Sequence, residues 1–169
     1  MFVKSYLELS QPIELVCACL LGERPESWIP GIVEAEARWQ GELLAQVGLD
    51  LGGRRLGQVG SVSVGEIAEV GRGLMIPITW QSVGIDGLFP VVEADLQVAP
   101  MGPELTQLSI SARYTPPLGP IGTIVDRALM HRLAEAVIRD FLHRIAKRIT
   151  GTEELAEPSR ARPAAASSD

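Results

Sequence analysis

Residues 117–150 read PLGPIGTIVDRALMHRLAEAVIRDFLHRIAKRIT and carry the pattern of one long amphipathic helix. Apolar residues recur at the spacing that places side chains on one helical face, and they are Met130, Ala134, Val137, Ile138, Phe141, Ile145 and Ile149. Pro120 suits a first helical position, and Gly151 suits a stop. A helix of about 30 residues is about 45 Å long. A wide apolar surface elsewhere in the chain has to cover its inner face.

The chain before this helix opens with a strand and two short helices. Residues 2–9 alternate and are rich in Val, Tyr and Leu, which is typical of a strand. Pro12 then opens an apolar helix over residues 13–21. A loop and a short second helix follow within residues 23–31, where Pro30 and Gly31 oppose continuation.

Five runs of alternating apolar and polar residues occupy the middle of the chain. They cover residues 43–51, 61–65, 74–80, 92–98 and 107–114. Turn-forming Gly and Pro residues separate the runs, so we expect consecutive hairpins. The alternation predicts an antiparallel sheet with one apolar and one wet face. Pro77 lies inside one run, which indicates an edge or a bulge at that position.

Together these elements predict an α+β fold in which a strongly curved antiparallel sheet wraps around the long C-terminal helix. We expect a single domain over residues 1–150, because a chain of 169 residues suits one domain. The remainder, residues 151–169, is mostly Ala, Pro, Ser, Glu and Arg, and we expect it to be a disordered tail. A curved sheet around a helix need not fill completely, and the gap would be a cavity with aliphatic walls.

The order of elements and three local sequences resemble the helix-grip superfamily. This superfamily includes START domains, ligand carriers and polyketide cyclases, often grouped as SRPBCC proteins. The sequences that carry the resemblance are Gln11–Val16, Pro25–Gly31 and Tyr114–Pro117. The resemblance implies six strands after the two helices, so either the run over residues 56–70 is bent into two strands or one strand is missing. It also implies binding of a hydrophobic small molecule or lipid, and a minority of such proteins are enzymes.

The cavity hypothesis assigns ligand contacts to inward-facing residues of the sheet and of the long helix. The candidates are Val47, Leu49, Ile76, Ile78, Trp80, Ala94, Leu96, Leu108 and Ile110 from the strands, and Met130, Ala134, Val137 and Phe141 from the helix. The alternative is that the same side chains fill a dry core, since protein interiors are normally close-packed.

Three aromatic residues have two interpretations each. Trp80 and Tyr114 carry polar tips on an apolar strand face, so they either orient a ligand or anchor the core. Trp28 lies in the short second helix, which guards the cavity mouth in the superfamily that the chain resembles. It either gates the cavity or fastens that helix to the sheet.

Whether the chain is an enzyme stays open. His131 and Glu135 are four residues apart at the margin of the apolar stripe, and such a pair can perform the general acid–base catalysis that a polyketide cyclase needs. Arg127 falls on the stripe and either meets a ligand carboxylate or phosphate or pairs with a nearby carboxylate or with solvent. Tyr114 is the fourth catalytic candidate. The four-residue spacing of His131 and Glu135 is common in helices and is not specific to catalysis.

Composition narrows the remaining classes. A net charge of −6 argues against a nucleic-acid binder. Cys17 and Cys19 offer neither a disulfide framework nor zinc spacing, which suits the cytoplasm. The sequence shows no signal-peptide pattern, no apolar run near the ~20 residues of a membrane span, and no metal or cofactor motif. The expected partner is a hydrophobic small molecule or lipid, and a fully packed interaction module or homodimer is the third alternative.

Overall fold

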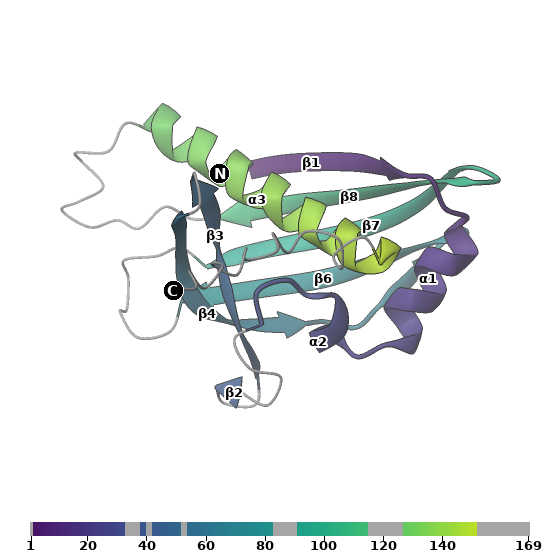
Figure 1. Ribbon diagram of the computed structural model, residues 1–169, viewed down its shortest axis with the longest axis horizontal. Helices are drawn as coiled ribbons and strands as arrows, with labels where there is room; N and C mark the ends of the chain where they lie inside the picture. Colours follow the sequence, from purple (N-terminus) through teal and green to yellow (C-terminus); the bar gives the residue numbers. More distant parts are fainter. Residues whose placement is uncertain are drawn as a thin grey trace, which may run out of the picture.

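The computed structural model describes residues 2–32, 38–39, 42–51, 54–82, 91–114 and 127–151. Within these ranges the chain forms an antiparallel sheet of eight strands and three helices (Figure 1). The elements are β1 Phe2–Leu9, α1 Ile13–Gly22, α2 Pro25–Trp28, β2 Arg38–Trp39, β3 Glu42–Leu51, β4 Arg54–Val64, β5 Ala68–Val70, β6 Gly73–Ser82, β7 Val92–Gly102, β8 Leu105–Tyr114 and α3 Arg127–Thr150.

The strands follow the order β1-β8-β7-β6-β4-β3-β2, and β5 pairs with β6 beside this path. The five predicted runs are confirmed as β3, β4, β6, β7 and β8. The run over residues 56–70 divides into β4 and β5, as in the first of the two alternatives stated above. With the two-residue strand β2, the described residues form seven strands after α2, where the resemblance implied six. Because β1 pairs with β8 along its whole length, the first and last strands of the described part of the chain lie side by side in the sheet.

Pro77 lies in β6 where that strand changes partners. Toward β7 the ladder is continuous, with Pro77 opposite Asp95. On the other side β4 pairs with β6 up to Ile78, and the pairing with β5 involves only Met75 and the residues before it. The Gly65 N–H donates to the Pro77 carbonyl oxygen at 2.8 Å. Proline has no N–H to donate, so the break in the ladder falls where a donor is missing.

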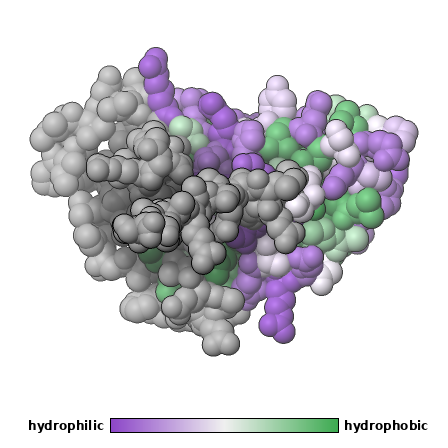
Figure 2. Space-filling view, viewed as in Figure 1, coloured by the Kyte–Doolittle hydropathy of each residue, from purple (hydrophilic) through white to green (hydrophobic). Residues whose placement is uncertain are grey.

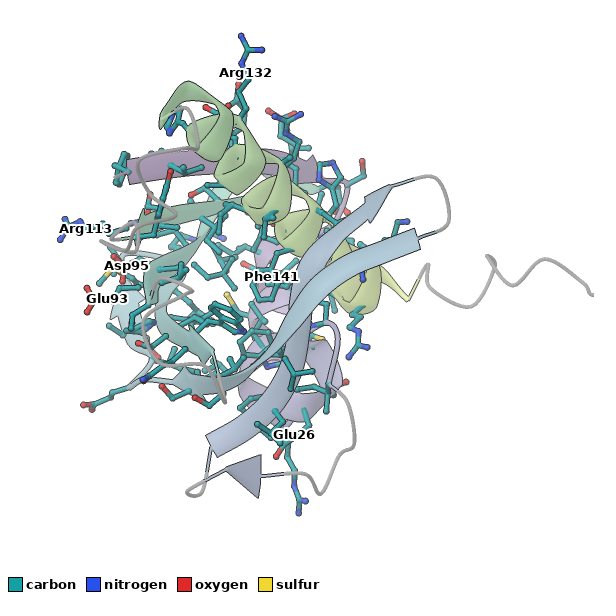
Figure 3. All side chains as sticks on the ribbon, turned by 90° about the vertical axis from the view of Figure 1, so that its left-hand side faces the viewer. Glu26, Glu93, Asp95, Arg113, Arg132 and Phe141 are labelled. Atoms are coloured by element: carbon teal, nitrogen blue, oxygen red, sulfur yellow. The ribbon has the colours of Figure 1, made fainter. Side chains whose placement is uncertain are left out.

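Helix α3 lies within the curve of the sheet and packs against β1, β8 and β3 (Figures 1 and 3). Among the α3 residues whose side chains are described, the buried ones are Ile138, Phe141, Leu142, Ile145 and Ala146. The predicted stripe therefore missed Leu142 and Ala146, while Val137 is only half-buried. The buried arc is wider than one stripe because the helix contacts β1 as well as β3. The predicted start at Pro120 lies outside the described residues.

Helices α1 and α2 close one end of the curved sheet. Ile13, Val16 and Leu20 of α1 are buried in the core that also holds Trp28 and Ile29. Both predicted short helices are confirmed, and the chain turns after them at Gly31, whose φ of 80° favours glycine.

Arg148 joins α2 to the C-terminal end of α3. Arg148 Nη1 donates to the carbonyl oxygens of Ile29 at 2.9 Å and Ser27 at 3.2 Å. These carbonyls lie at the end of α2, where backbone acceptors lack partners within the helix. The contact holds α2, and with it Trp28, against α3. The predicted tail beyond Gly151 lies outside the described residues.

Candidate ligand site between the sheet and α3

The register of the strands assembles a concave apolar face from residues far apart in sequence. One cross-strand row joins Trp80, Val92 and Tyr114, and the next joins Ile78, Ala94 and Ala112. Deeper rows contain Ile76, Leu96 and Ile110, then Leu74, Val98 and Leu108. Alternate residues of each strand thus face α3, as the sequence pattern predicted.

Burial along this face changes from one end to the other. The two deep rows are almost completely buried, and they contain Ile76, Leu96, Ile110, Leu74, Val98 and Leu108. By contrast, Val92 and Ala94 pack against the core but keep part of their surface accessible. Ala134 of α3 also packs against the core and is only partly buried. We call Val92 and Ala94 the β7 floor. Among the four rows, the partly accessible side chains are Trp80, Val92 and Ala94, and all three lie in the two rows nearest the start of β7.

Most of the predicted ligand contacts lie on this face or on α3. Ile76, Ile78, Leu96, Leu108 and Ile110 belong to the fully packed part of the face. Phe141 points from α3 toward the sheet, whereas Glu93, Asp95 and Arg113 lie on the outer face (Figure 3). Four other candidates, Val47, Leu49, Arg127 and Met130, lie in β3 and α3, and their side chains are outside the described part.

The aromatic candidates occupy different depths. Trp28 is 1% exposed and lies in the same core as the buried residues of α1 and α3. Tyr114 is 5% exposed on the concave face, while Trp80 is partly accessible there. The indole of Trp80 lies against Gly60 of β4, and its Nε1 is buried without a hydrogen-bond partner among the described residues. Trp80 and Tyr114 thus flank Val92 on the two neighbouring strands.

The acid–base candidates on α3 lie at the helix surface. His131 Nε2 and Glu135 Oε1 are 3.3 Å apart, and the side chains are 41% and 45% exposed. These two side chains contact each other and are open to solvent, whereas Tyr114 is buried in the sheet. The structure therefore brings His131 and Glu135 together but does not place them in the same environment as Tyr114.

Neither cysteine is activated. Burial raises the pKa of the Cys17 thiol above its ordinary value, and Glu14 and Glu69 raise it further. Burial likewise raises the pKa of Cys19, with a smaller contribution from Glu23. Because the thiolate is the reactive form, these shifts oppose nucleophilic catalysis. Both thiols are free.

The described residues contain neither a metal centre nor a transmembrane helix. No cluster of three His, Cys, Asp or Glu side chains among them could hold a metal ion. No described helix combines the length and the apolar character that a bilayer crossing requires.

Two residues of this region, Val92 and Gly60 beside Trp80, were not singled out from the sequence. Val92 belongs to a predicted run, and its partial exposure at the start of β7 is a property of the assembled sheet. Gly60 precedes a predicted run, and only the pairing of β4 with β6 brings it beside Trp80. No local signal could have identified either residue.

No protein-family model and no curated protein matches the chain. Solved structures do match. A protein from Thermus thermophilus is 16% identical with a TM-score of 0.59, over 90% of this chain and 99% of that one. A conserved protein from Geobacillus kaustophilus is 18% identical with a TM-score of 0.57, over 88% and 95%. The Zhui aromatase/cyclase from Streptomyces sp. R1128 is 14% identical with a TM-score of 0.54, over 91% and 93%.

Identities this low compare folds and not activities. The matches extend over nearly the whole of each chain, so the likeness concerns the complete arrangement and not one supersecondary unit. Together with the sheet curved around α3, they show that this chain has the helix-grip fold.

Proposed function

We propose that the chain binds a hydrophobic small molecule or lipid between the concave face of the sheet and α3. The observation that carries this proposal is the partial accessibility of the β7 floor, Val92 and Ala94, on a face whose deep rows pack completely. Ala94 lies between Ile78 and Ala112 in its row. A methyl side chain in the middle of an apolar face, with its surface still accessible, supports space for an apolar guest.

The surroundings of the β7 floor supply apolar walls. Trp80 and Tyr114 flank Val92 on the sheet. From α3, Phe141 belongs to the core against which Val92 and Ala94 pack, and Ala134 packs against the same core. Trp80 Nε1 and the Tyr114 hydroxyl are both buried, so these two residues offer a guest apolar ring surface. Further proposed contacts are Val47, Leu49, Arg127, Met130 and Val137. The free thiols of Cys17 and Cys19 support a reducing, cytoplasmic location.

Filling the proposed space tests the function. In Ala94→Phe the new ring projects from the β7 floor toward α3, and we expect the affinity for the uncharged fluorophore N-phenyl-1-naphthylamine to fall about tenfold. Ala68→Phe is the matched control, because Ala68 is exposed on β5 and its replacement should leave the affinity unchanged. Equal binding by wild type and a folded Ala94→Phe protein would contradict the proposal. Independently of the probe, native mass spectrometry of protein purified from its own host would identify a co-purifying guest.

A cyclase-like enzyme is the second candidate. It is favoured by the His131–Glu135 contact at 3.3 Å and by the likeness to an aromatase/cyclase. The exposure of the pair weighs against it, since general acid–base groups work best near a bound substrate. Loss of turnover of a polyketone by His131→Gln, with its binding retained, would support this candidate.

A homodimer is the third candidate. Helix α1 is apolar on several sides, and Leu15 and Leu21 are exposed. Apolar residues are visible at this end of the molecule, at the right of Figure 2. Light scattering at increasing protein concentration would detect self-association, and Leu15→Glu would abolish an α1-mediated dimer.

A further inference from the structure

The indole of Trp80 occupies the place that a side chain on Gly60 would need. In the ladder between β4 and β6, Trp80 pairs with Val62, and Gly60 is the next β4 residue on the same face. A Cβ atom added to Gly60 would lie 2.5 Å from Trp80 Cε2 and 2.6 Å from Nε1. These separations are far below van der Waals contact, so the indole lies directly over the glycine.

This contact fixes the direction in which Trp80 extends. Strand β6 lies between β4 and β7 in the sheet. An indole over Gly60 therefore extends across β4, away from Val92, its partner on β7. Val92 and Ala94, on the strand on the other side of β6, keep part of their surface accessible.

Packing, and not a hydrogen bond, holds the indole in this position as far as the described residues show. Trp80 Nε1 is buried and finds no acceptor among them. A buried donor without an acceptor is unfavourable. Among the described residues, no hydrogen bond from the indole therefore opposes a change of Trp80 rotamer when a side chain at position 60 displaces the ring.

We propose that Gly60 is a positioning residue for the ligand site: by carrying no side chain, it lets the Trp80 indole lie over β4 and keeps the β7 floor open. This inference rests on the proposed function. It adds that the width of the site is set by a residue that need not touch the ligand. A methyl group at position 60 would push the indole toward Val92 and Ala94 and narrow the site.

A double-mutant cycle with N-phenyl-1-naphthylamine as the probe tests this role. In the presence of Trp80, we expect Gly60→Ala to lower the affinity about tenfold. In a Trp80→Leu background, the same substitution should change affinity by less than about twofold, because no indole remains to be displaced. Gly22→Ala is the matched control, since a Cβ atom there meets nothing within 4 Å.

The double-mutant cycle separates displacement of the Trp80 indole from a general distortion of the backbone at position 60. The added Cβ would also lie 2.5 Å from the Gln81 carbonyl oxygen, so Gly60→Ala is expected to lower the melting temperature in both backgrounds. A backbone effect would weaken binding equally in the wild-type and Trp80→Leu backgrounds, and that result would overturn the inference. The inference is supported if, in the Trp80→Leu background, Gly60→Ala no longer weakens binding but still lowers the melting temperature.

Wild-type protein gives a second readout if Gly60→Ala does not fold. In a nuclear Overhauser spectrum, the indole Hε1 of Trp80 should show a cross-peak to the Gly60 Hα protons. Cross-peaks to the Val92 methyl groups in its place would overturn the inference. If wild type binds no probe, the proposed function itself fails. If wild type and Gly60→Ala bind equally, the function stands and only the role of Gly60 fails.

Discussion

At the residue scale, Arg148 shows how one side chain can position a whole element. Its guanidinium donates to carbonyls at the end of α2, and no sequence pattern links these positions, which are more than a hundred residues apart. The sequence places cations in the last turns of α3, where the helix dipole favours them. The structure gives one of them a tertiary role as well.

Replacing Arg148 should destabilise the protein. Arg148→Met keeps much of the apolar stem and removes the donors, and we expect a loss of about 1.5–3 kcal/mol in the free energy of unfolding. Lys147→Met is the control, because Lys147 is exposed in the same turn and its replacement should change stability by less than about 0.5 kcal/mol. Urea denaturation measures both. Equal stability of the two variants would show that the Arg148 hydrogen bonds to α2 do not stabilise the fold.

The candidate site was partly predictable from individual residues. Alternation along each strand placed Trp80, Ala94 and Tyr114 on the apolar face, because side chains in a strand alternate between faces. It could not distinguish Ala94, which keeps accessible surface, from Leu96, which is fully buried two residues later. That difference depends on what lies opposite each residue, which is a property of the assembled fold.

At the element scale, α3 shows both the reach and the limit of periodicity. The spacing of apolar residues identified the helix and most of its buried face. It missed Leu142, which is fully buried, because a single stripe describes a helix with one neighbour. Here the helix contacts strands that lie apart in the sheet, β1 and β3, and both bury side chains. The pairing of β1 with β8 was likewise beyond a period-two pattern, which carries no information on distant partners.

Leu142, which the predicted stripe missed, provides a test of how α3 packs. Leu142→Ala removes a fully buried side chain, and we expect it to lower the free energy of unfolding by about 2–5 kcal/mol. Arg139→Ala on the exposed side of the same helix should have an effect below about 0.5 kcal/mol. Thermal and urea denaturation check both values. A small effect at Leu142 would mean that α3 is not docked on the sheet as described.

At the scale of the whole molecule, the sheet separates two environments. Glu93, Asp95 and Arg113 face outward, and Phe141 faces the enclosed side with the apolar rows (Figure 3). Helices α1 and α2 seal one end, where the deep rows are completely buried. The accessible β7 floor lies toward the other end, at the start of β7 and beside the end of β8. This difference in burial between the two ends predicts that a guest enters at the end opposite α1.

Intermolecular nuclear Overhauser effects from bound N-phenyl-1-naphthylamine measure the position of the guest most directly. We expect cross-peaks to the methyl groups of Val92 and Ala94 on the sheet and of Ala134 on α3. Cross-peaks confined to Leu15 and Leu21 of α1, with none to the β7 floor, would place binding on the outside of the molecule and contradict the account.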